Sequence, residues 1–372
     1  MDVRLLGTGG PAGWPEPGCR CASCRRAAAG GGRRPGGVLV DGRLRIDPGQ
    51  PPGFVPDGYR VAAVPGGWDL TGPDGVRLLI AGDLGQVPDP PSGTLPFDLL
   101  LLDMLARPAQ LGALRGRGLA GPGAVAAVRF AGHRIASEAE LVRRAGLWRV
   151  AVPGDGDTLG VRVPGGGPDP AGGALPAGGP HRTLVLGGAR SGKSAEAELR
   201  LAAEPQVTYL AAGPWPDGAA PPADGPGADP EWARRVAAHR AARPDRWATV
   251  ESADVAGALG RLDGAVLVDG IGTWLTAVMT QAGAWPADGA PAGWEPPGAA
   301  EVAARVDELV TAWRQTAARV VAVSDQVGDG VVPATPAGRL FRDQLGWLNQ
   351  RLAAESEETV LVVAGRALSL PG

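Results

Sequence analysis

The chain has 372 residues, 36 Lys and Arg against 39 Asp and Glu, and a formal net charge of −3. Its length predicts two or three domains, and its near balance of charge excludes a generally basic surface for nucleic acid or anionic membranes. Residues 1–7 lack the apolar core of a signal peptide, and no apolar run reaches membrane-spanning length. We therefore expect a cytoplasmic protein with no nucleic-acid partner and no membrane span.

Residues 1–160 are rich in short β-type runs bounded by Gly, Pro or Asp, which predicts a layered α/β domain with much sheet. One helix is expected at 137–145, because Ser137 is a good N-cap and two glutamates follow in the first turn. The strands are expected at 3–6, 38–40, 44–46, 60–64, 76–81, 97–102, 125–130 and 149–152.

The three cysteines, Cys19, Cys21 and Cys24, lie within six residues of one another. An odd number of cysteines packed so closely argues against a disulfide framework. The spacing leaves two possibilities open, a metal site or a chance group of reduced thiols.

Residues 161–181 form a Pro-, Gly- and Ala-rich linker, at which we place the main domain boundary. Strands and helices alternate through residues 182–372, which predicts a mainly parallel, three-layer α/β/α sheet. Ligands on such sheets bind at the carboxyl ends of the strands. The strands are expected at 183–186, 207–211, 265–268, 320–323 and 360–364, and the helices at 195–201, 231–242, 273–282, 301–318 and 336–355.

The segment Gly187-Gly188-Ala189-Arg190-Ser191-Gly192-Lys193-Ser194 has the G-x-x-x-x-G-K-S pattern of a phosphate-binding loop. It stands between an apolar strand and a helix-forming run, which is the context that this motif requires. We expect Lys193 to contact the β- and γ-phosphates of a nucleotide and the Ser194 hydroxyl to bind Mg²⁺.

Two further residues are candidates for the same chemistry. Asp269 ends an apolar strand and is expected to hold Mg²⁺ directly or through water. His239 shares a helix face with Val236 and Trp232, so its spacing alone favours a partly buried histidine. A neutral imidazole can also attack phosphorus and carry a nucleotidyl group, with Arg240 and Arg243 nearby to neutralise phosphate charge.

Residues 183–370 resemble the bifunctional adenosylcobinamide kinase / adenosylcobinamide-phosphate guanylyltransferase family of cobalamin biosynthesis. A generic phosphate-loop kinase would share only the first of the motifs that carry this resemblance. They are the loop 187–194, His239-Arg240-Ala241-Ala242-Arg243-Pro244 with Trp247 and Glu251, Asp269-Gly270-Ile271-Gly272-Thr273-Trp274-Leu275, Val327-Gly328-Asp329-Gly330-Val331-Val332-Pro333, and Phe341-Arg342-Asp343-Gln344-Leu345-Gly346 with Asn349-Gln350-Arg351-Leu352-Ala353.

The resemblance implies two reactions. The first phosphorylates adenosylcobinamide with ATP or GTP, and the second transfers GMP from GTP to adenosylcobinamide phosphate. It implies His239 as the guanylylated residue and a homo-oligomer, since the family tends towards trimers. The implied nucleotide contacts are the loop Gly187, Gly188, Ala189, Arg190, Ser191, Gly192, Lys193 and Ser194, then Ala211, Ala212, Gly213, Arg240, Ala241, Ala242, Arg243, Glu251 and Asp269.

The chain departs from the family pattern at two places. Ser324-Asp325-Gln326 stands where the family usually has Ser-Asn-Glu, so a carboxylate is lost at 326 and gained at 325. Gly270-Ile271-Gly272 stands where Cys-Leu-Thr is usual. The long Pro- and Gly-rich segments 213–230 and 283–298 are interpreted as loop insertions.

Residues 1–160 resemble metallo-β-lactamase-fold phosphodiesterases, through Leu5-Leu6-Gly7-Thr8-Gly9-Gly10, the cysteine segment and Leu44-Arg45-Ile46-Asp47. That likeness implies an αββα domain. The three histidines of the chain, at 133, 181 and 239, cannot supply the family's two-metal cluster. Asp83 stands at the position of its bridging aspartate, and Phe130 at that of a catalytic histidine.

The same resemblance implies that His133 completes a structural Zn²⁺ site with Cys19, Cys21 and Cys24, because tetrahedral zinc takes a fourth ligand. This first domain is then a degenerate, catalytically silent scaffold or partner surface. Two other functions for the second domain stay open: a nucleotide-binding regulatory protein without transfer activity, and a general small-molecule kinase.

Overall fold

The computed structural model describes residues 1–372 except 48, 88–89, 129–131, 161–180, 213–242 and 288–295. The chain divides into two compact units, Met1–Pro176 with Ala202–Pro205, and Ala177–Leu201 with Gln206–Gly372. Almost all of the expected linker lies outside the described residues, so the domain boundary at 161–181 stays a prediction. In the described part of the chain, no helix is both long and apolar enough to cross a membrane.

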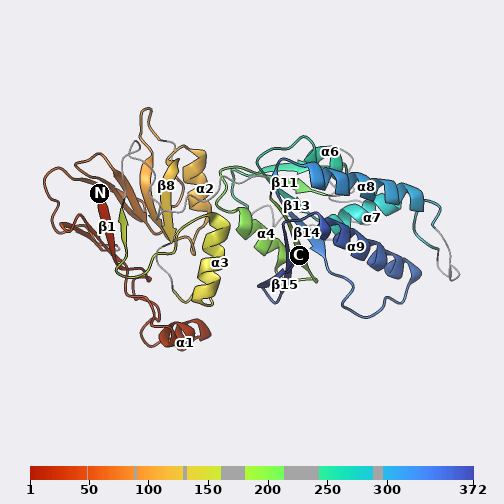
Figure 1. Ribbon diagram of the computed structural model, residues 1–372, viewed down its shortest axis with the longest axis horizontal. Helices are drawn as coiled ribbons and strands as arrows, with labels where there is room; N and C mark the ends of the chain where they lie inside the picture. Colours follow the sequence, from red (N-terminus) through yellow and green to blue (C-terminus); the bar gives the residue numbers. More distant parts are fainter. Residues whose placement is uncertain (48, 88–89, 129–131, 161–180, 213–242, 288–295) are drawn as a thin grey trace, which may run out of the picture. The chain divides into compact units, whose positions relative to one another are not determined.

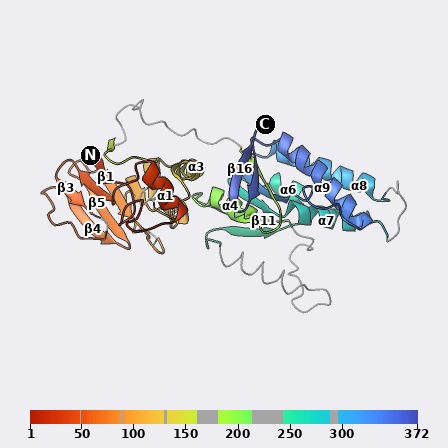
Figure 2. The same ribbon diagram turned by 90° about the horizontal axis from the view of Figure 1, so that it is seen from below.

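The described part of the first unit contains two sheets (Figure 2). The antiparallel sheet has the order β3-β2-β1-β9 and consists of β1 (Asp2–Gly7), β2 (Gly37–Val40), β3 (Leu44–Ile46) and β9 (Thr158–Gly160). The mixed sheet runs in chain order through β4 (Arg60–Val64), β5 (Gly67–Thr71), β6 (Arg77–Ala81), β7 (Phe97–Leu102) and β8 (Ala120–Val128).

Side chains from both sheets form one core in this unit. Val3 and Val38 of the antiparallel sheet belong to the same buried cluster as Leu70, Leu78 and Leu99 of the mixed sheet. Helices α1 (Ala22–Ala29), α2 (Ala109–Gly116) and α3 (Glu138–Trp148) complete the unit. Two packed sheets with added helices agree with the expected layers, while the likeness to metallo-β-lactamase-fold phosphodiesterases stays a prediction.

The expected helix after Ser137 is confirmed as α3, whose first turn is capped by the Ser137 hydroxyl accepting the Glu140 N–H. The strand expected at 149–152 is wrong. Arg149 takes a left-handed conformation, with φ of 55°, and its N–H caps the end of α3. A residue that ends a helix in this way cannot also begin a regular strand.

The second unit is built on a sheet whose described strands have the order β12-β11-β13-β14-β10-β15-β16. All pairs are parallel except the last, β15–β16. The strands are β10 (Arg182–Gly187), β11 (Val207–Ala211), β12 (Ala248–Glu251), β13 (Ala265–Asp269), β14 (Arg319–Asp325), β15 (Glu358–Val363) and β16 (Arg366–Leu370). The helices in the described residues of this unit are α4 (Lys193–Leu201), α6 (Val255–Leu259), α7 (Ile271–Gln281), α8 (Ala299–Gln315) and α9 (Pro336–Ala354). The helix expected at 231–242 lies outside the described residues.

Two buried clusters lie on opposite faces of this sheet. One joins the strands to α6, α7, α8 and α9, and includes Trp274, Leu309 and Leu348. The other joins alternate strand residues to Ala197 and Leu201 of α4. These clusters make the predicted three-layer α/β/α arrangement (Figure 1), and the fold class of this unit is confirmed.

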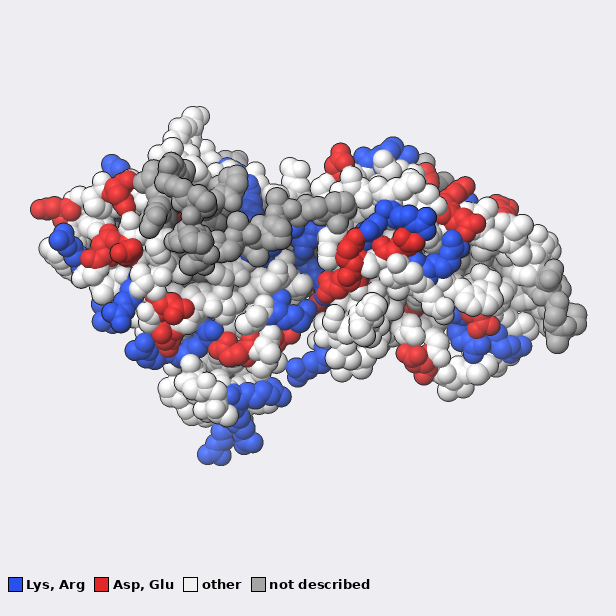
Figure 3. All heavy atoms as spheres, in the orientation of Figure 1, with Lys and Arg blue, Asp and Glu red and all other residues white. Residues whose placement is uncertain are grey.

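The surface carries both signs of charge. On the face drawn in Figure 3, the Lys and Arg side chains are interspersed with Asp and Glu. Among its described residues, this face therefore carries no large patch of a single sign of charge.

A network of charged side chains connects α4 to Glu358, the first residue of β15. The Arg200 side chain is 4% exposed and bonds both Glu196 Oε1, at 3.0 Å, and Glu358 Oε2, at 2.5 Å. Burial acts to raise the pKa of Glu358, but hydrogen bonds from His181 and Arg200 lower that pKa to about 2. Glu358 is therefore held as a carboxylate that compensates a buried guanidinium.

We expect Glu358→Gln to lower the free energy of unfolding of this unit by about 2 kcal/mol at pH 7, because it removes half of the charge that compensates Arg200. The loss should be smaller near pH 3, since the stabilisation that the ionised Glu358 contributes is lost progressively as the pH falls from the unfolded pKa, near 4.3, to the folded pKa of about 2. Urea unfolding of the full chain at both pH values measures this.

The matched control is Glu308→Gln, which breaks an exposed helical pair with Arg305. We expect that change to cost roughly 0.5 kcal/mol or less. Equal losses for the two variants would contradict a stabilising role for the buried network.

Candidate functional site

The phosphate-loop segment joins the end of β10 to the start of α4. Arg190 and Gly192 have φ of 56° and 97°, in the left-handed region. Backbone of this kind turns successive N–H groups inward and forms an anion-binding concavity, which the N-terminus of α4 extends. The Ser191 hydroxyl is buried and meets no hydrogen-bond partner among the described residues, so a phosphate oxygen would satisfy it.

Neighbouring strands hold the loop in place. The Gln326 N–H, just after β14, donates to the Gly187 carbonyl at 3.0 Å, and the Gly365 N–H donates to the Ser191 carbonyl at 2.8 Å. A Cβ at Gly187 would lie 2.4 Å from Ser191 Oγ and 2.8 Å from the Val362 carbonyl oxygen. Glycine is therefore required at the first position of the motif by the close approach of the loop and β15.

Lys193 Nζ donates to the Gly188 carbonyl at 3.2 Å and lies 2.9 Å from Asp325 Oδ1. Its side chain is 15% exposed. The ammonium group is thus folded back over the loop, where a β- or γ-phosphate would be bound. The pairing of β10 with β14, which aligns Gly187 with Asp325, brings the two charged residues together.

Asp269 ends β13 at the same edge of the sheet. It accepts a hydrogen bond from the Tyr209 hydroxyl of β11, and the Arg243 guanidinium lies 3.1 Å from the Tyr209 ring centroid. Burial, then the charge of Asp269, raises the pKa of Tyr209. Tyr209 therefore stays protonated and orients the Asp269 carboxylate.

The sheet also aligns several other predicted residues. Ala211 of β11 is paired with both Glu251 of β12 and Asp269 of β13, and the Ala212 N–H donates to the Asp269 carbonyl. The predicted contacts Gly213, Arg240, Ala241 and Ala242, and the proposed nucleophile His239, lie outside the described residues.

The oxygen atoms near the loop that could bind a metal ion fit Mg²⁺, which prefers oxygen ligands. They are the Ser194 hydroxyl at the start of α4 and the Asp269 and Asp325 carboxylates at the strand ends. From the sequence, the carboxylate at Asp325 was noted as a departure from the family pattern without a site role, and Tyr209 was missed. Asp325 follows an apolar strand, as Asp269 does, and that signal could have indicated its position at the sheet edge.

In the first unit, the structure brings Cys19, Cys21, Cys24 and His133 together, with their candidate ligand atoms all within 4.8 Å of one another. Cys19 Sγ lies 3.8 Å from His133 Nδ1. Tetrahedral bonds of about 2.0–2.3 Å would separate ligand atoms by about 3.5 Å, so the cluster is close to the size that zinc requires. The segment is held because Cys21 is the N-cap of α1 and its Sγ accepts the Cys24 N–H.

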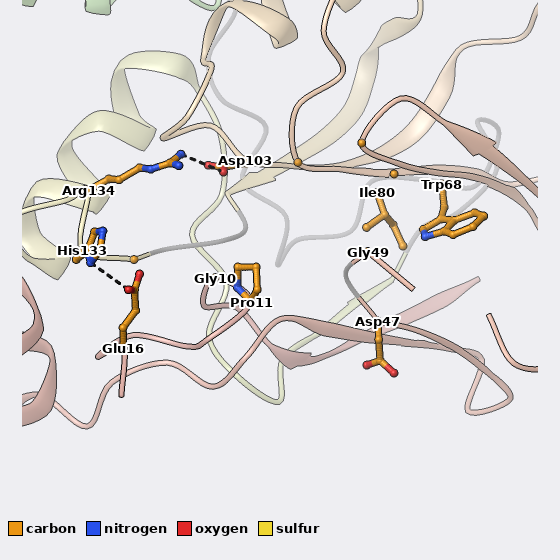
Figure 4. Close-up of a pocket in the computed structure, with 14 residues that line it drawn as sticks. Gly10, Pro11, Glu16, Asp47, Gly49, Trp68, Ile80, Asp103, His133 and Arg134 are labelled. Atoms are coloured by element: carbon orange, nitrogen blue, oxygen red, sulfur yellow. Dashed lines mark ion pairs between the residues drawn. The ribbon is translucent and has the colours of Figure 1, made fainter. Parts of the chain in front are cut away.

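A cavity of about 360 Å³ lies beside this cluster (Figure 4). Its wall includes two ion pairs, His133 with Glu16 at 3.2 Å and Arg134 with Asp103 at 3.8 Å. Burial raises the pKa of Asp103. Asp83 is more than half exposed and lies 3.2 Å from Arg107, while Phe130 lies outside the described residues.

The comparison with protein families places the second unit. The family described as "Cobinamide kinase / cobinamide phosphate guanyltransferase" matches residues 183–370, half of the chain. The chain belongs to this family. The match covers the phosphate loop, the Asp269 strand and the β15–β16 pair of the second unit.

Curated relatives of the family agree with this placement. The "Bifunctional adenosylcobalamin biosynthesis protein CobU" of Salmonella typhimurium is 37% identical over 194 residues, which cover 49% of this chain and 95% of the relative. The protein of the same name from Escherichia coli is 35% identical over 187 residues, 49% of this chain and 95% of the relative. The corresponding CobP of Pseudomonas aeruginosa is 34% identical over 197 residues, 51% of this chain and 98% of the relative.

We expect Gly187→Ala to weaken GTP binding by roughly tenfold or more, because the added methyl group displaces the loop that presents its N–H groups to phosphate. Gly188→Ala is the matched control: a Cβ there has no neighbour within 4 Å. Calorimetric titration of both variants with GTP and Mg²⁺ checks this. Similar losses at the two glycines would contradict the proposed loop geometry.

Proposed function

We propose that this chain phosphorylates adenosylcobinamide and then transfers GMP from GTP to adenosylcobinamide phosphate, which gives adenosylcobinamide-GDP in cobalamin biosynthesis. The proposal rests on one observation above all. A complete phosphate loop lies at the carboxyl end of a parallel sheet, within the residues 183–370 that place the chain in the cobinamide kinase and guanyltransferase family.

In the kinase step, the loop N–H groups and Lys193 hold the triphosphate in line with the substrate hydroxyl. Ser194 and Asp269 are the proposed Mg²⁺ ligands, and the bound ion neutralises charge on the phosphates. The contact between Tyr209 and Asp269 supports this role, because it fixes the carboxylate at the sheet edge. ATP and GTP are the proposed donors.

In the guanylyl step, a nitrogen of the His239 imidazole attacks the α-phosphorus of GTP, and the bond to pyrophosphate breaks. The phosphate of the second substrate then attacks the same phosphorus, and the P–N bond breaks. Arg243, four residues after His239 in the chain, supports this assignment. It lies over the ring of Tyr209, whose hydroxyl donates to Asp269. Glu251 and the phosphate loop are the remaining proposed contacts of the guanine nucleotide. The active form of the protein is proposed to be a homo-oligomer.

Incubation with α-labelled GTP tests the covalent step. We expect an acid-labile, alkali-stable GMP adduct on the wild-type chain, which His239→Ala abolishes and His181→Ala retains. GTP binding without an adduct would favour the regulatory alternative. Phosphorylation of a small substrate without an adduct would favour a general kinase.

We further propose that Cys19, Cys21, Cys24 and His133 hold a structural Zn²⁺ in the first unit, supported by the convergence of their ligand atoms. Such a site contributes folding free energy directly, since the metal binds only the ordered segment. It would join the start of α1 to His133, which is 109 residues after Cys24 in the chain (133 − 24).

Metal analysis of the purified protein should find about one zinc per chain, and Cys21→Ser should lose it, because three-ligand sites bind structural zinc poorly. His181→Ala, which changes a histidine outside the cluster, should retain the metal. A wild-type chain free of zinc after metal-replete expression would contradict the proposal.

A further inference from the structure

Asp325 is an acidic residue that the structure places against the lysine of the phosphate loop. Its Oδ1 lies 2.9 Å from Lys193 Nζ. Its Oδ2 lies 2.9 Å from the point where a Cβ at Gly272 would be. The carboxylate thus fills the space between the ammonium group and the first turn of α7, and it fits there because position 272 has no side chain.

The backbone around Asp325 is fixed on both sides. The buried Asn349 donates to the Asp325 carbonyl at 3.1 Å and accepts from the Ser324 hydroxyl at 2.6 Å. On the other side, the Gln326 N–H donates to the Gly187 carbonyl at the start of the loop. The backbone of Asp325 is therefore fixed beside the loop, and the pair with Lys193 directs its carboxylate towards the loop.

Asp325 is also the nearer of the two strand-end carboxylates to the loop. β14 is hydrogen-bonded directly to β10, whereas β13, which carries Asp269, is one strand further away. With roughly 4.8 Å between neighbouring strands, Asp269 starts about 10 Å from the loop strand. The charge of Asp325 therefore acts more strongly on a phosphate in the loop.

This placement gives Asp325 two effects on a bound triphosphate. It competes with the phosphates for the Lys193 ammonium, and its own negative charge repels them. The Lys193 side chain is 15% exposed and that of Asp325 41%, so solvent screens the charge of Asp325 in part, and the close distance to the loop is what makes its effect on a bound phosphate appreciable. A divalent cation on the phosphates removes most of the repulsion, because its positive charge offsets the phosphate charge that faces the carboxylate.

We infer that Asp325 makes nucleotide binding conditional on a divalent cation, so that the loop accepts the Mg²⁺ complex of a nucleoside triphosphate and rejects the free anion. The inference rests on the proposed nucleotide chemistry of the loop. Asp325 acts through Lys193 and through the charge of the ligand, and is a positioning residue. The carboxylate gained at 325 and the glycine at 272 are both departures from the family pattern, and they fit each other sterically.

The test compares the affinity of the full-length chain for GTP in excess Mg²⁺ and in EDTA, by calorimetry or equilibrium dialysis. The variants are Asp325→Asn, which keeps the shape of the side chain, and Asp325→Ser, which removes it. The matched control is Asp329→Asn. It removes the same charge four residues along the chain, where the carboxylate is bonded by Gln326 Nε2.

We expect removal of Mg²⁺ to weaken GTP binding by the wild type and by Asp329→Asn at least tenfold. Both Asp325 variants should bind free GTP roughly tenfold more tightly than the wild type, so that their dependence on Mg²⁺ falls to a few-fold. A role limited to folding would change both affinities together and leave their ratio unaltered.

Two results would overturn the inference, and they can be told apart. If GTP binds with the same Mg²⁺ dependence in wild type and Asp325→Asn, the inference fails while the proposed function stands. If the folded wild type binds no GTP even with Mg²⁺, the proposed function fails and the inference fails with it.

Discussion

The parallel pairing of β10 with β14 is the constraint on which the second unit depends. It aligns Gly187 with Asp325, so the phosphate loop and a carboxylate emerge at one edge of the sheet. The apolar residues of these two strands, such as Val185 and Val321, are fully or almost fully buried, and a slip of the register would break their packing on that face of the sheet. The position of charge at the site is thus decided by the packing of uncharged side chains beneath it.

The site is electrostatically prepared on both sides of the loop. Asp325 pairs with Lys193, and Tyr209 contacts both the Asp269 carboxylate and the Arg243 guanidinium. Among the described residues, the Lys193 ammonium and the Asp269 carboxylate therefore have partners before any ligand binds. When a ligand binds, the contact of Lys193 with Asp325 is exchanged for a contact of Lys193 with the ligand. This exchange favours ligands whose negative charge can replace that of the displaced carboxylate.

Much of the second unit could be predicted from the sequence, because buried parallel strands are continuous apolar runs and glycine-rich loops are local signals. The strand at Val207–Ala211 was predicted with the bounds that the structure gives. β12 was missed, since Ala248 and Thr249 are exposed and the strand shows no apolar run. α2 was missed in the first unit because no side chain caps it. The pair Lys193–Asp325 joins residues 132 positions apart (325 − 193), which only the strand order reveals.

The turn between β15 and β16 has one more consequence. Ala364 and Gly365 take left-handed conformations there, and the Gly365 N–H bonds the Ser191 carbonyl. A nascent chain that still lacks this turn contains the phosphate-loop motif, but it lacks the hydrogen bond from Gly365 that holds the Ser191 carbonyl. During synthesis the phosphate loop can therefore gain this bond only after residue 365 has been added, 174 residues later than Ser191 (365 − 191).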